Sequence, residues 1–333
     1  MPTRKRRSTR ASVAGAAIAG ALMVYGCALR PADIALEQPE IYQPEDVATD
    51  TDPAQVYTNL GNEYYDKGMF AQAVDEYHRA IEVNPYADAA HAGTGMAFYK
   101  LGRRDDAERS FRRALRLNER NIIARNGLAL VVDDHQERAA QMEAAISYNP
   151  DMPELRNNLC YFLAESGEYD RAVTECQASI RLDSLNFHAH YNLGYAYQRQ
   201  GRLDQALDEY QLARQLNPGW ARVMNNMALV YYYKSRFSDS IEAYENAIAA
   251  DGSEGVFHYN LALAYEALAH RIRALEDEGS AVPETYGVHG SQGWRMLYRR
   301  AADGMRTYLD MSPNAPNSSH IRVKINELRR RAS

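Results

Sequence analysis

Two distant stretches of the chain carry the same residue types at the same spacing. They are AQVYTNLGNEYYDKGMFAQAVDEYHRAIEVNPYA (residues 54–87) and FHAHYNLGYAYQRQGRLDQALDEYQLARQLNPGW (residues 187–220). Counted from the first residue of each stretch, a large side chain, Leu, Gly, Tyr, Ala, Tyr, Ala and Pro occupy positions 4, 7, 8, 11, 20, 24, 27 and 32. The three- and four-residue spacing on both sides of a Gly-containing turn predicts two helices.

The same pattern recurs through most of the chain. Repeats begin at residues 54, 88, 122, 153, 187, 221 and 255, and all but the third and last are 34 residues long. This pattern resembles the tetratricopeptide repeat (TPR), a helical hairpin whose small residues let the two helices approach. The resemblance implies an all-α fold, a right-handed superhelix of about seven hairpins whose first helices line a concave surface. The expected repeats are 54–87, 88–121, 122–152, 153–186, 187–220, 221–254 and 255–313.

Two repeats depart from the pattern. The third lacks three residues near 133–135, so we expect its turn or its second helix to be shorter. The seventh contains a polar, Gly-rich insertion at 276–292, before a second helix expected at 294–311. The insertion is either a surface excursion or a loop whose flanking Tyr286 and Trp294 close over the groove.

Residues 314–333 are expected to contain a capping helix. Ile321, Ile325 and Leu328 lie at helical spacing and form one apolar face. The run 329–331 is Arg-Arg-Arg, which complements the negative end of a helix dipole. A terminal helix with one apolar and one charged face can cover the open end of a repeat array.

The N-terminal segment has a different composition. The formal net charge of the chain is −6, but residues 1–27 contain five basic side chains and no acidic one. An uncharged apolar stretch follows and ends in Val24-Tyr25-Gly26-Cys27, which resembles the lipobox of bacterial lipoproteins. This implies a signal peptide at 1–26 and a lipidated Cys27 that anchors the protein without spanning the membrane. The alternative is an ordinary secretory signal, or a weak membrane helix, with a chance cysteine.

The segment after Cys27 predicts an extended tether at 27–53. Four prolines and seven acidic residues against one Arg leave no apolar stripe at helical spacing. In enterobacterial lipoproteins, an Asp directly after the lipidated cysteine favours retention at the inner membrane. The residue here is Ala28, so the resemblance implies a place at the outer membrane, facing the periplasm. Beyond residue 27 the chain is acidic, which argues against nucleic acid as a partner.

No catalytic motif emerges from the sequence, so we expect no enzyme activity, cofactor or bound metal. His188 and His190 lie two residues apart on an expected helix and therefore point in divergent directions. The acidic cluster at 133–137 is a weak metal candidate and is better explained as a solvated turn.

Asparagine recurs at position 6 of most repeats. A row of amides can donate to and accept from an extended backbone, and this row resembles that of the peptide-binding repeats of O-linked N-acetylglucosamine transferase. The alternative is a structural role, because asparagine is common at this position. The row is interrupted by Gly93 and Gly127. The candidate peptide-binding amides are Asn59, Asn158, Asn192, Asn226 and Asn260.

Tyrosines at positions 5, 9, 12 and 13 are expected on the same concave face, where large rings with few rotors favour recognition. The charges among them are too few and too mixed for a basic clamp on a C-terminal carboxylate. The candidate tyrosines are Tyr65, Tyr99, Tyr161, Tyr191, Tyr195, Tyr232, Tyr233 and Tyr259.

Cys160 and Cys176 occupy positions 8 and 24 of the fourth repeat, which face each other in an antiparallel hairpin. They form either a disulfide, as an oxidising periplasm permits, or two reduced core thiols.

These features predict a non-enzymatic scaffold that binds an extended peptide or a partner helix. The combination of anchor, tether and repeats resembles the lipoproteins of type IV and Tad pilus assembly. It also resembles adaptors of cell-wall hydrolases and proteases. A subunit of glycan export and a purely structural spacer are further alternatives. We expect protein or peptide partners in the cell envelope.

Overall fold

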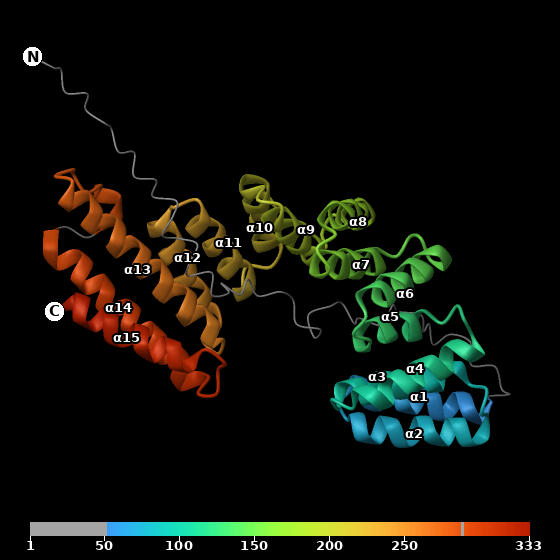
Figure 1. The fold of residues 1–333 in the computed structure, drawn as a ribbon. Coiled ribbons are helices and arrows are strands. Elements are labelled where there is room, and N and C mark those ends of the chain that lie inside the picture. The colour runs from blue at the N-terminus through green and yellow to red at the C-terminus, as the bar shows by residue number, and fades with distance from the viewer. Residues whose placement is uncertain (1–51, 288–289) are drawn as a thin grey trace, which may run out of the picture. The chain divides into compact units, whose positions relative to one another are not determined.

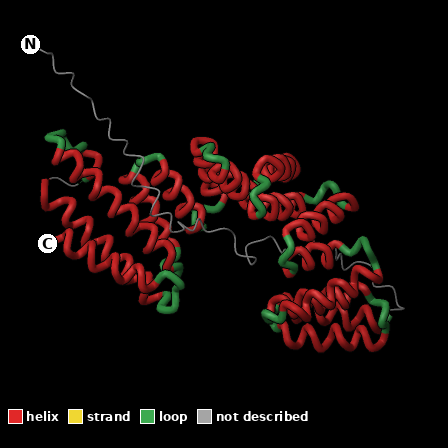
Figure 2. Tube along the Cα trace, in the orientation of Figure 1, coloured by secondary structure: helices red, strands yellow, loops and turns green. Residues whose placement is uncertain are grey.

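The computed structural model describes residues 52–287 and 290–333. The predicted signal peptide, Cys27 and the predicted tether up to residue 51 lie outside this part. Every regular element within it is a helix (Figure 2). None of the described helices is long and apolar enough to cross a membrane. The described residues fall into two compact units, 52–230 and 231–333.

Unit 52–230 consists of consecutive helical hairpins (Figure 1). In each, a first helix (A) is followed by a second (B). Helices α3, α5, α7 and α9 each pack on the preceding B helix, and α3, α5 and α9 also pack on the preceding A helix. The A helices are α1 (Pro53–Asp66), α3 (Asp88–Lys100), α5 (Ile122–Val131), α7 (Pro153–Glu165), α9 (Phe187–Arg199) and α11 (Ala221–Tyr233), which continues past residue 230. The B helices are α2 (Phe70–Val83), α4 (Arg104–Leu117), α6 (His135–Tyr148), α8 (Tyr169–Leu182) and α10 (Leu203–Leu216).

A left-handed residue ends the A helix in most hairpins. Gly68 and Gly102 both have φ of 73°, and equivalent glycines stand at 167 and 201. The Gly68 N–H donates to the carbonyl of Tyr65 at 2.9 Å, which closes the helix end. Glycine adopts positive φ at little cost, so the chain reverses within three residues. Ser235, with φ of 57°, holds this position in the sixth repeat.

The third repeat is shortened in its A helix. Helix α5 has 10 residues, where α3 and α7 have 13, whereas α6 has the full 14. The expectation of a shorter turn or B helix was therefore wrong. Asp134 caps α6 by accepting from the Glu137 N–H at 2.6 Å. The acidic cluster at 133–137 thus acts, in part, as a helix cap.

A disulfide joins α7 to α8. Cys160 and Cys176 are bonded, with 5.3 Å between their Cα atoms, and both side chains are fully buried. Of the two alternatives left open by the sequence, the structure contains the bridge.

Unit 231–333 contains α12 (Phe237–Ala250), α13 (Gly255–Asp277), η3 (Glu284–Tyr286), α14 (Gly290–Met311) and α15 (Ser318–Ala332). The additional length of the seventh repeat is largely helical. Helix α13 has 23 residues and ends at Asp277, next to the predicted start of the insertion at 276, whereas α14 has 22 residues and begins at Gly290, four residues before the predicted helix start at 294. Leu268, Ile272 and Leu275 are buried, and they explain why α13 continues.

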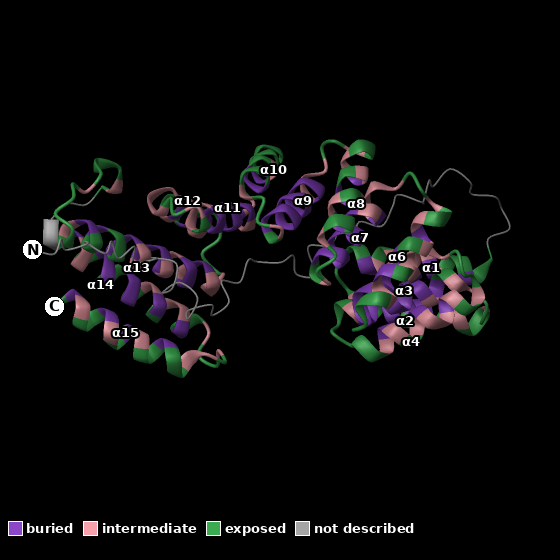
Figure 3. Cartoon of the chain, turned by 45° about the horizontal axis from the view of Figure 1, so that its top comes forward, coloured by how far each residue is buried: buried purple, intermediate pink, exposed green. Residues whose placement is uncertain are grey.

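Helix α15 caps this unit as predicted. Ile321, Ile325 and Leu328 are all buried in the core that α13 and α14 share. Figure 3 shows both buried and exposed residues along α15. At the helix end, Arg299 donates to the carbonyl of Ala332 at 3.3 Å.

Candidate functional site

The asparagine row lies between repeats and not on an open surface. Asn158, Asn192, Asn226 and Asn260 are each at most 1% exposed. Our expectation that these four amides face an accessible groove was therefore wrong. Asn59, in the first repeat, is half-buried, and its Oδ1 accepts from the Gln55 amide at 2.8 Å.

Three of the buried amides donate to position 5 of the preceding repeat. Asn158 Nδ2 donates to Asn126 Oδ1 at 3.0 Å, and Asn192 Nδ2 donates to Asn157 Oδ1 at 2.8 Å. Asn226 Nδ2 donates to the Tyr191 hydroxyl at 2.8 Å. A regular hydrogen bond therefore joins consecutive A helices at buried positions, where a broken bond is costly.

The two interruptions of the row have a steric cause. A Cβ on Gly93 would lie 2.5 Å from the Tyr77 ring, and one on Gly127 would lie 2.2 Å from the Phe111 ring. Each ring comes from position 24 of the preceding repeat. Position 6 is thus a packing joint, where glycine leaves room for the Tyr77 and Phe111 rings.

The predicted tyrosines differ widely in exposure. Tyr99 and Tyr232 are half-buried and Tyr233 is 50% exposed. Tyr191 packs on Trp220, with 4.6 Å between ring centroids, and belongs to the core. The buried members are Tyr65, Tyr161, Tyr191, Tyr195 and Tyr259.

Four tyrosines of unit 52–230 form what we call the tyrosine face: Tyr65, Tyr99, Tyr161 and Tyr195. They come from four different A helices. Tyr99 raises the pKa of Tyr65, and both Tyr99 and Tyr195 raise that of Tyr161, so the four rings form a chain of neighbours. Burial raises the pKa of Tyr65 and of Tyr195 to about 12, and it also raises the pKa of Tyr99. Their hydroxyls therefore stay protonated near neutral pH and can donate hydrogen bonds.

At one end of the tyrosine face, Tyr195 links two opposite charges. Its hydroxyl donates to Glu165 Oε1 at 3.1 Å and accepts from Arg199 Nη1 at 2.9 Å. Glu165 and Arg199 are exposed, while Tyr195 is 6% exposed. The Arg199 guanidinium also lies 5.5 Å from the centre of the Tyr169 ring, a contact to the B helix that our sequence reasoning missed. The Glu165 carboxylate and the Arg199 guanidinium are thus held next to each other at the protein surface.

In unit 231–333, the capping helix supplies the partner of an acidic residue on α13. Lys324 of α15 lies 2.6 Å from Glu266, which also contacts His270 at 3.4 Å. Burial opposes ionisation, but hydrogen bonds from His270 and Lys324 hold the pKa of Glu266 below its usual value. Tyr259 packs on Tyr308, with 5.2 Å between centroids.

Trp294 does not close over a groove. Its Nε1 donates to Glu276 at 2.9 Å, and its ring packs on Tyr298. Tyr286 packs against the same core. Both residues therefore belong to the hydrophobic core of unit 231–333.

The predicted histidine pair is also used internally. His190 bonds to Glu209 at 2.7 Å, and this bond raises the pKa of the histidine. Burial lowers the pKa of His188 to about 4. Within the part of the chain that the structure describes, no group of three or more His, Cys, Asp or Glu side chains is arranged to hold a metal.

Comparison with known proteins agrees with the repeat structure. Models of the TPR repeat and the tetratricopeptide repeat match residues 54–86, 88–121, 161–201, 187–220 and 225–279. The chain is therefore a TPR protein, and the predicted fold class is confirmed. Such a protein is a scaffold for protein–protein interaction.

A curated relative and two solved structures are similar to parts of the chain. Protein CTR9 homolog of Arabidopsis thaliana is 34% identical over 88 residues, which are 26% of this chain and 8% of that protein. The APC/C hetero-tetramer Cut9–Hcn1 matches with a TM-score of 0.61 at 16% identity, over 83% of this chain and 48% of that one. A tetratricopeptide repeat protein from Parabacteroides merdae matches with a TM-score of 0.58 at 14% identity, over 85% and 99%. These structural likenesses show the fold alone.

Proposed function

We propose that this TPR scaffold binds an extended peptide or a partner helix at the groups along its tyrosine face that reach solvent, half-buried Tyr99 and exposed Glu165 and Arg199. The observation that carries the proposal is the fixed arrangement of Glu165, Tyr195 and Arg199. The hydroxyl of buried Tyr195 already holds the exposed Glu165 and Arg199 side chains in place. These two side chains therefore lose little further conformational entropy when a partner binds. The hydrogen bond from Asn192 to Asn157 supports this surface by joining α9 to α7, the helices that carry Tyr195 and Tyr161.

We further propose that the scaffold works at the outer membrane, held by a lipid on Cys27 and facing the periplasm. The support is in the sequence: a basic N-terminus, a short apolar stretch and Gly26-Cys27. In this setting the partner belongs to an envelope machine such as a type IV or Tad pilus. The adaptor role for cell-wall hydrolases or proteases, and the role in glycan export, are the alternatives that identification of the partner would decide.

A photo-crosslinker tests the binding surface. Benzoylphenylalanine at exposed Lys100, beside Tyr99, should capture an envelope protein, and the same group at Tyr86, 75% exposed in the α2–α3 turn, should not. Glu165→Ala with Arg199→Ala should reduce capture about tenfold. The matched control removes the exposed ion pair Arg236–Asp239 and should leave capture unchanged. Equal capture from both positions, or no effect of the double variant, would contradict the proposal.

Membrane fractionation tests the anchor separately. Cys27→Ser removes the thiol that would carry the lipid, so the protein should move from the membrane fraction to the soluble periplasm. A variant that stays with the membrane would refute lipidation and leave the binding surface untouched.

A further inference from the structure

Unit 52–230 contains a shallow cavity of about 300 Å³ on its surface, wide open to solvent, between the second and third repeats. It is lined by Arg112, Leu115 and Arg116 of α4, Arg125 and Leu128 of α5, and Gln141 of α6. None of these residues belongs to the tyrosine face. The cavity combines three guanidinium groups, one amide and two apolar side chains.

The surrounding sequence is basic within an acidic chain. Residues 100–125 contain nine Lys or Arg side chains and four Asp or Glu side chains, whereas the whole chain has a net charge of −6. This local excess of positive charge favours an anion near the cavity.

The three arginines differ in how far they are neutralised. Arg112 is 2.9 Å from each of two carboxylates, Glu108 and Glu137. Arg125 meets no carboxylate: its Nη1 donates to the neutral amide of Gln141 at 2.9 Å, and its Nε donates to the carbonyl of Glu119 at 2.8 Å. Arg116 has neither a hydrogen bond nor an ion pair among the described residues, and it is exposed.

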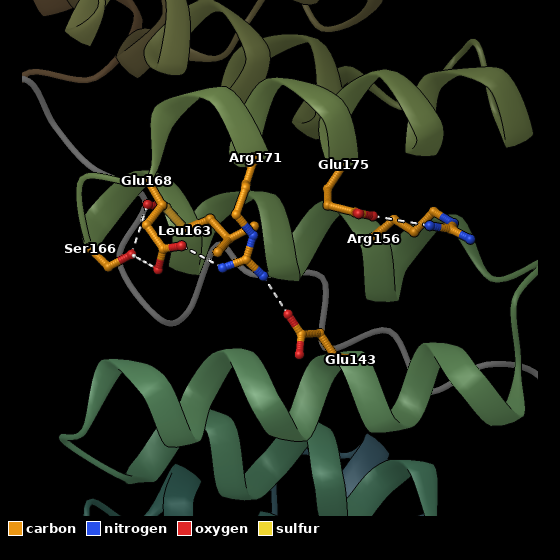
Figure 4. Close-up of polar contacts among 7 residues, drawn as sticks. All are labelled: Glu143, Arg156, Leu163, Ser166, Glu168, Arg171 and Glu175. Atoms are coloured by element: carbon orange, nitrogen blue, oxygen red, sulfur yellow. Dashed lines mark hydrogen bonds and ion pairs between the residues drawn. The ribbon is translucent and has the colours of Figure 1, made fainter.

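Equivalent positions in the next two repeats carry an acid where the third has Gln141. Arg156 and Glu175 lie on α7 and α8 at the positions of Arg125 and Gln141 on α5 and α6, and they form an ion pair at 3.0 Å (Figure 4). In the fifth repeat His190 and Glu209 pair at 2.7 Å. The third repeat thus keeps the cation of this pair and lacks its carboxylate.

We infer that this cavity binds an oxyanion, a carboxylate or phosphate group carried by a small ligand or a partner side chain. Arg116 and Arg125 supply charge and paired N–H donors, which match the two oxygens of such a group. Leu115 and Leu128 offer an apolar wall to the body that carries it. Arg112 adds less charge because Glu108 and Glu137 already pair with it.

Titration of the arginine side chains by NMR tests the site in the purified protein. The Nε–H resonances of Arg116 and Arg125 are followed as inorganic phosphate or succinate is added, with sodium chloride holding ionic strength constant. We expect saturable shifts with at least one anion. Arg116→Gln should weaken that binding at least fivefold, and so should Gln141→Glu, which restores the ion pair of the next repeat and should leave folding intact.

Arg113→Gln is the matched control, because it removes the same charge from α4 outside the cavity lining. Binding that Arg113→Gln leaves unchanged and the other two variants weaken supports the site. A response to phosphate alone identifies a phosphorylated ligand, and a response to succinate alone identifies a carboxylate. No saturable shift with either anion overturns the inference, as does equal weakening by all three variants.

Discussion

The joints between repeats are built differently in the earlier and later parts of unit 52–230. Between the first and second repeats, and between the second and third, the residue at the joint is glycine (Gly93 and Gly127), and an aromatic ring from the preceding B helix fills the space. In the fourth to sixth repeats it is asparagine, and the space holds a hydrogen bond to the preceding A helix instead.

The preceding B helix explains the difference in one case. Position 24 is Phe111 before Gly127 but Cys176 before Asn192, and the bonded cysteine projects no ring. Tyr210, before Asn226, has a hydroxyl 3.4 Å from the amide and accepts a hydrogen bond from it. One position thus serves two kinds of packing, and its residue type alone does not reveal a binding role.

Loss of the disulfide should have the largest effect on stability. Cys160→Ala with Cys176→Ala opens a link across 16 residues, which should cost about 3 kcal/mol of unfolding free energy. Urea unfolding with and without reductant measures it. Reductant should destabilise the parent protein and leave the double variant unchanged. If reductant did not change the urea unfolding midpoint of the parent protein, the stability of the later repeats would not depend on the disulfide.

Exchanging the joint residue should have the next largest effect. Gly127→Asn places a side chain against the Phe111 ring, and overpacking of this kind costs about 1–3 kcal/mol. Gly102→Asn is the control, because a Cβ added at Gly102 would meet no heavy atom within 4 Å and asparagine tolerates its positive φ. Equal unfolding midpoints of the two variants would mean that the glycine joint is not a steric requirement.

The smallest effect concerns pH in the fifth repeat. The pKa of His188 is about 4 in the folded protein, below the ordinary value near 6.5, so the unfolded chain binds its proton more readily. Its contribution to stability therefore falls as pH decreases from about 6.5 to 4. The pKa of His190 is raised, so its stabilisation is present at low pH and is lost as pH rises through that pKa.

His188→Phe keeps a ring beside Phe187 and Trp220 and removes the titration. As the pH falls from 7.5 to 5, the unfolding free energy of the variant should rise by about 1 kcal/mol relative to that of the parent, allowing for the partial exposure of the ring. Urea midpoints at the two pH values measure this gain. A constant difference between the two proteins would exclude His188 as the source.

The sequence predicted the hairpins and the capping helix because their apolar positions repeat at helical spacing. It did not place the missing residues of the third repeat, since a gap at 133–135 in the alignment fits a shorter helix or a shorter turn equally well. The extension of α13 had a visible signal in Leu268, Ile272 and Leu275, which continue the helical spacing.

The asparagines show where sequence reasoning reaches its limit. Burial of Asn192 depends on Asn157, 35 residues earlier, and on how closely two A helices approach. Spacing within one repeat cannot show that distance. The polar link between Glu165, Tyr195 and Arg199 likewise joins two repeats. Each of these contacts depends on how two neighbouring hairpins pack, which the sequence of one repeat does not specify.

A double-mutant cycle on Asn157 and Asn192 tests most directly whether the asparagine row fastens one repeat to the next. Unfolding free energies are measured for the parent, Asn157→Ala, Asn192→Ala and the double variant. Because the two amides are buried and share a hydrogen bond, the account predicts a coupling energy of about 1 kcal/mol, with each single variant clearly destabilised. Additive effects with no coupling, or single variants as stable as the parent, would contradict it.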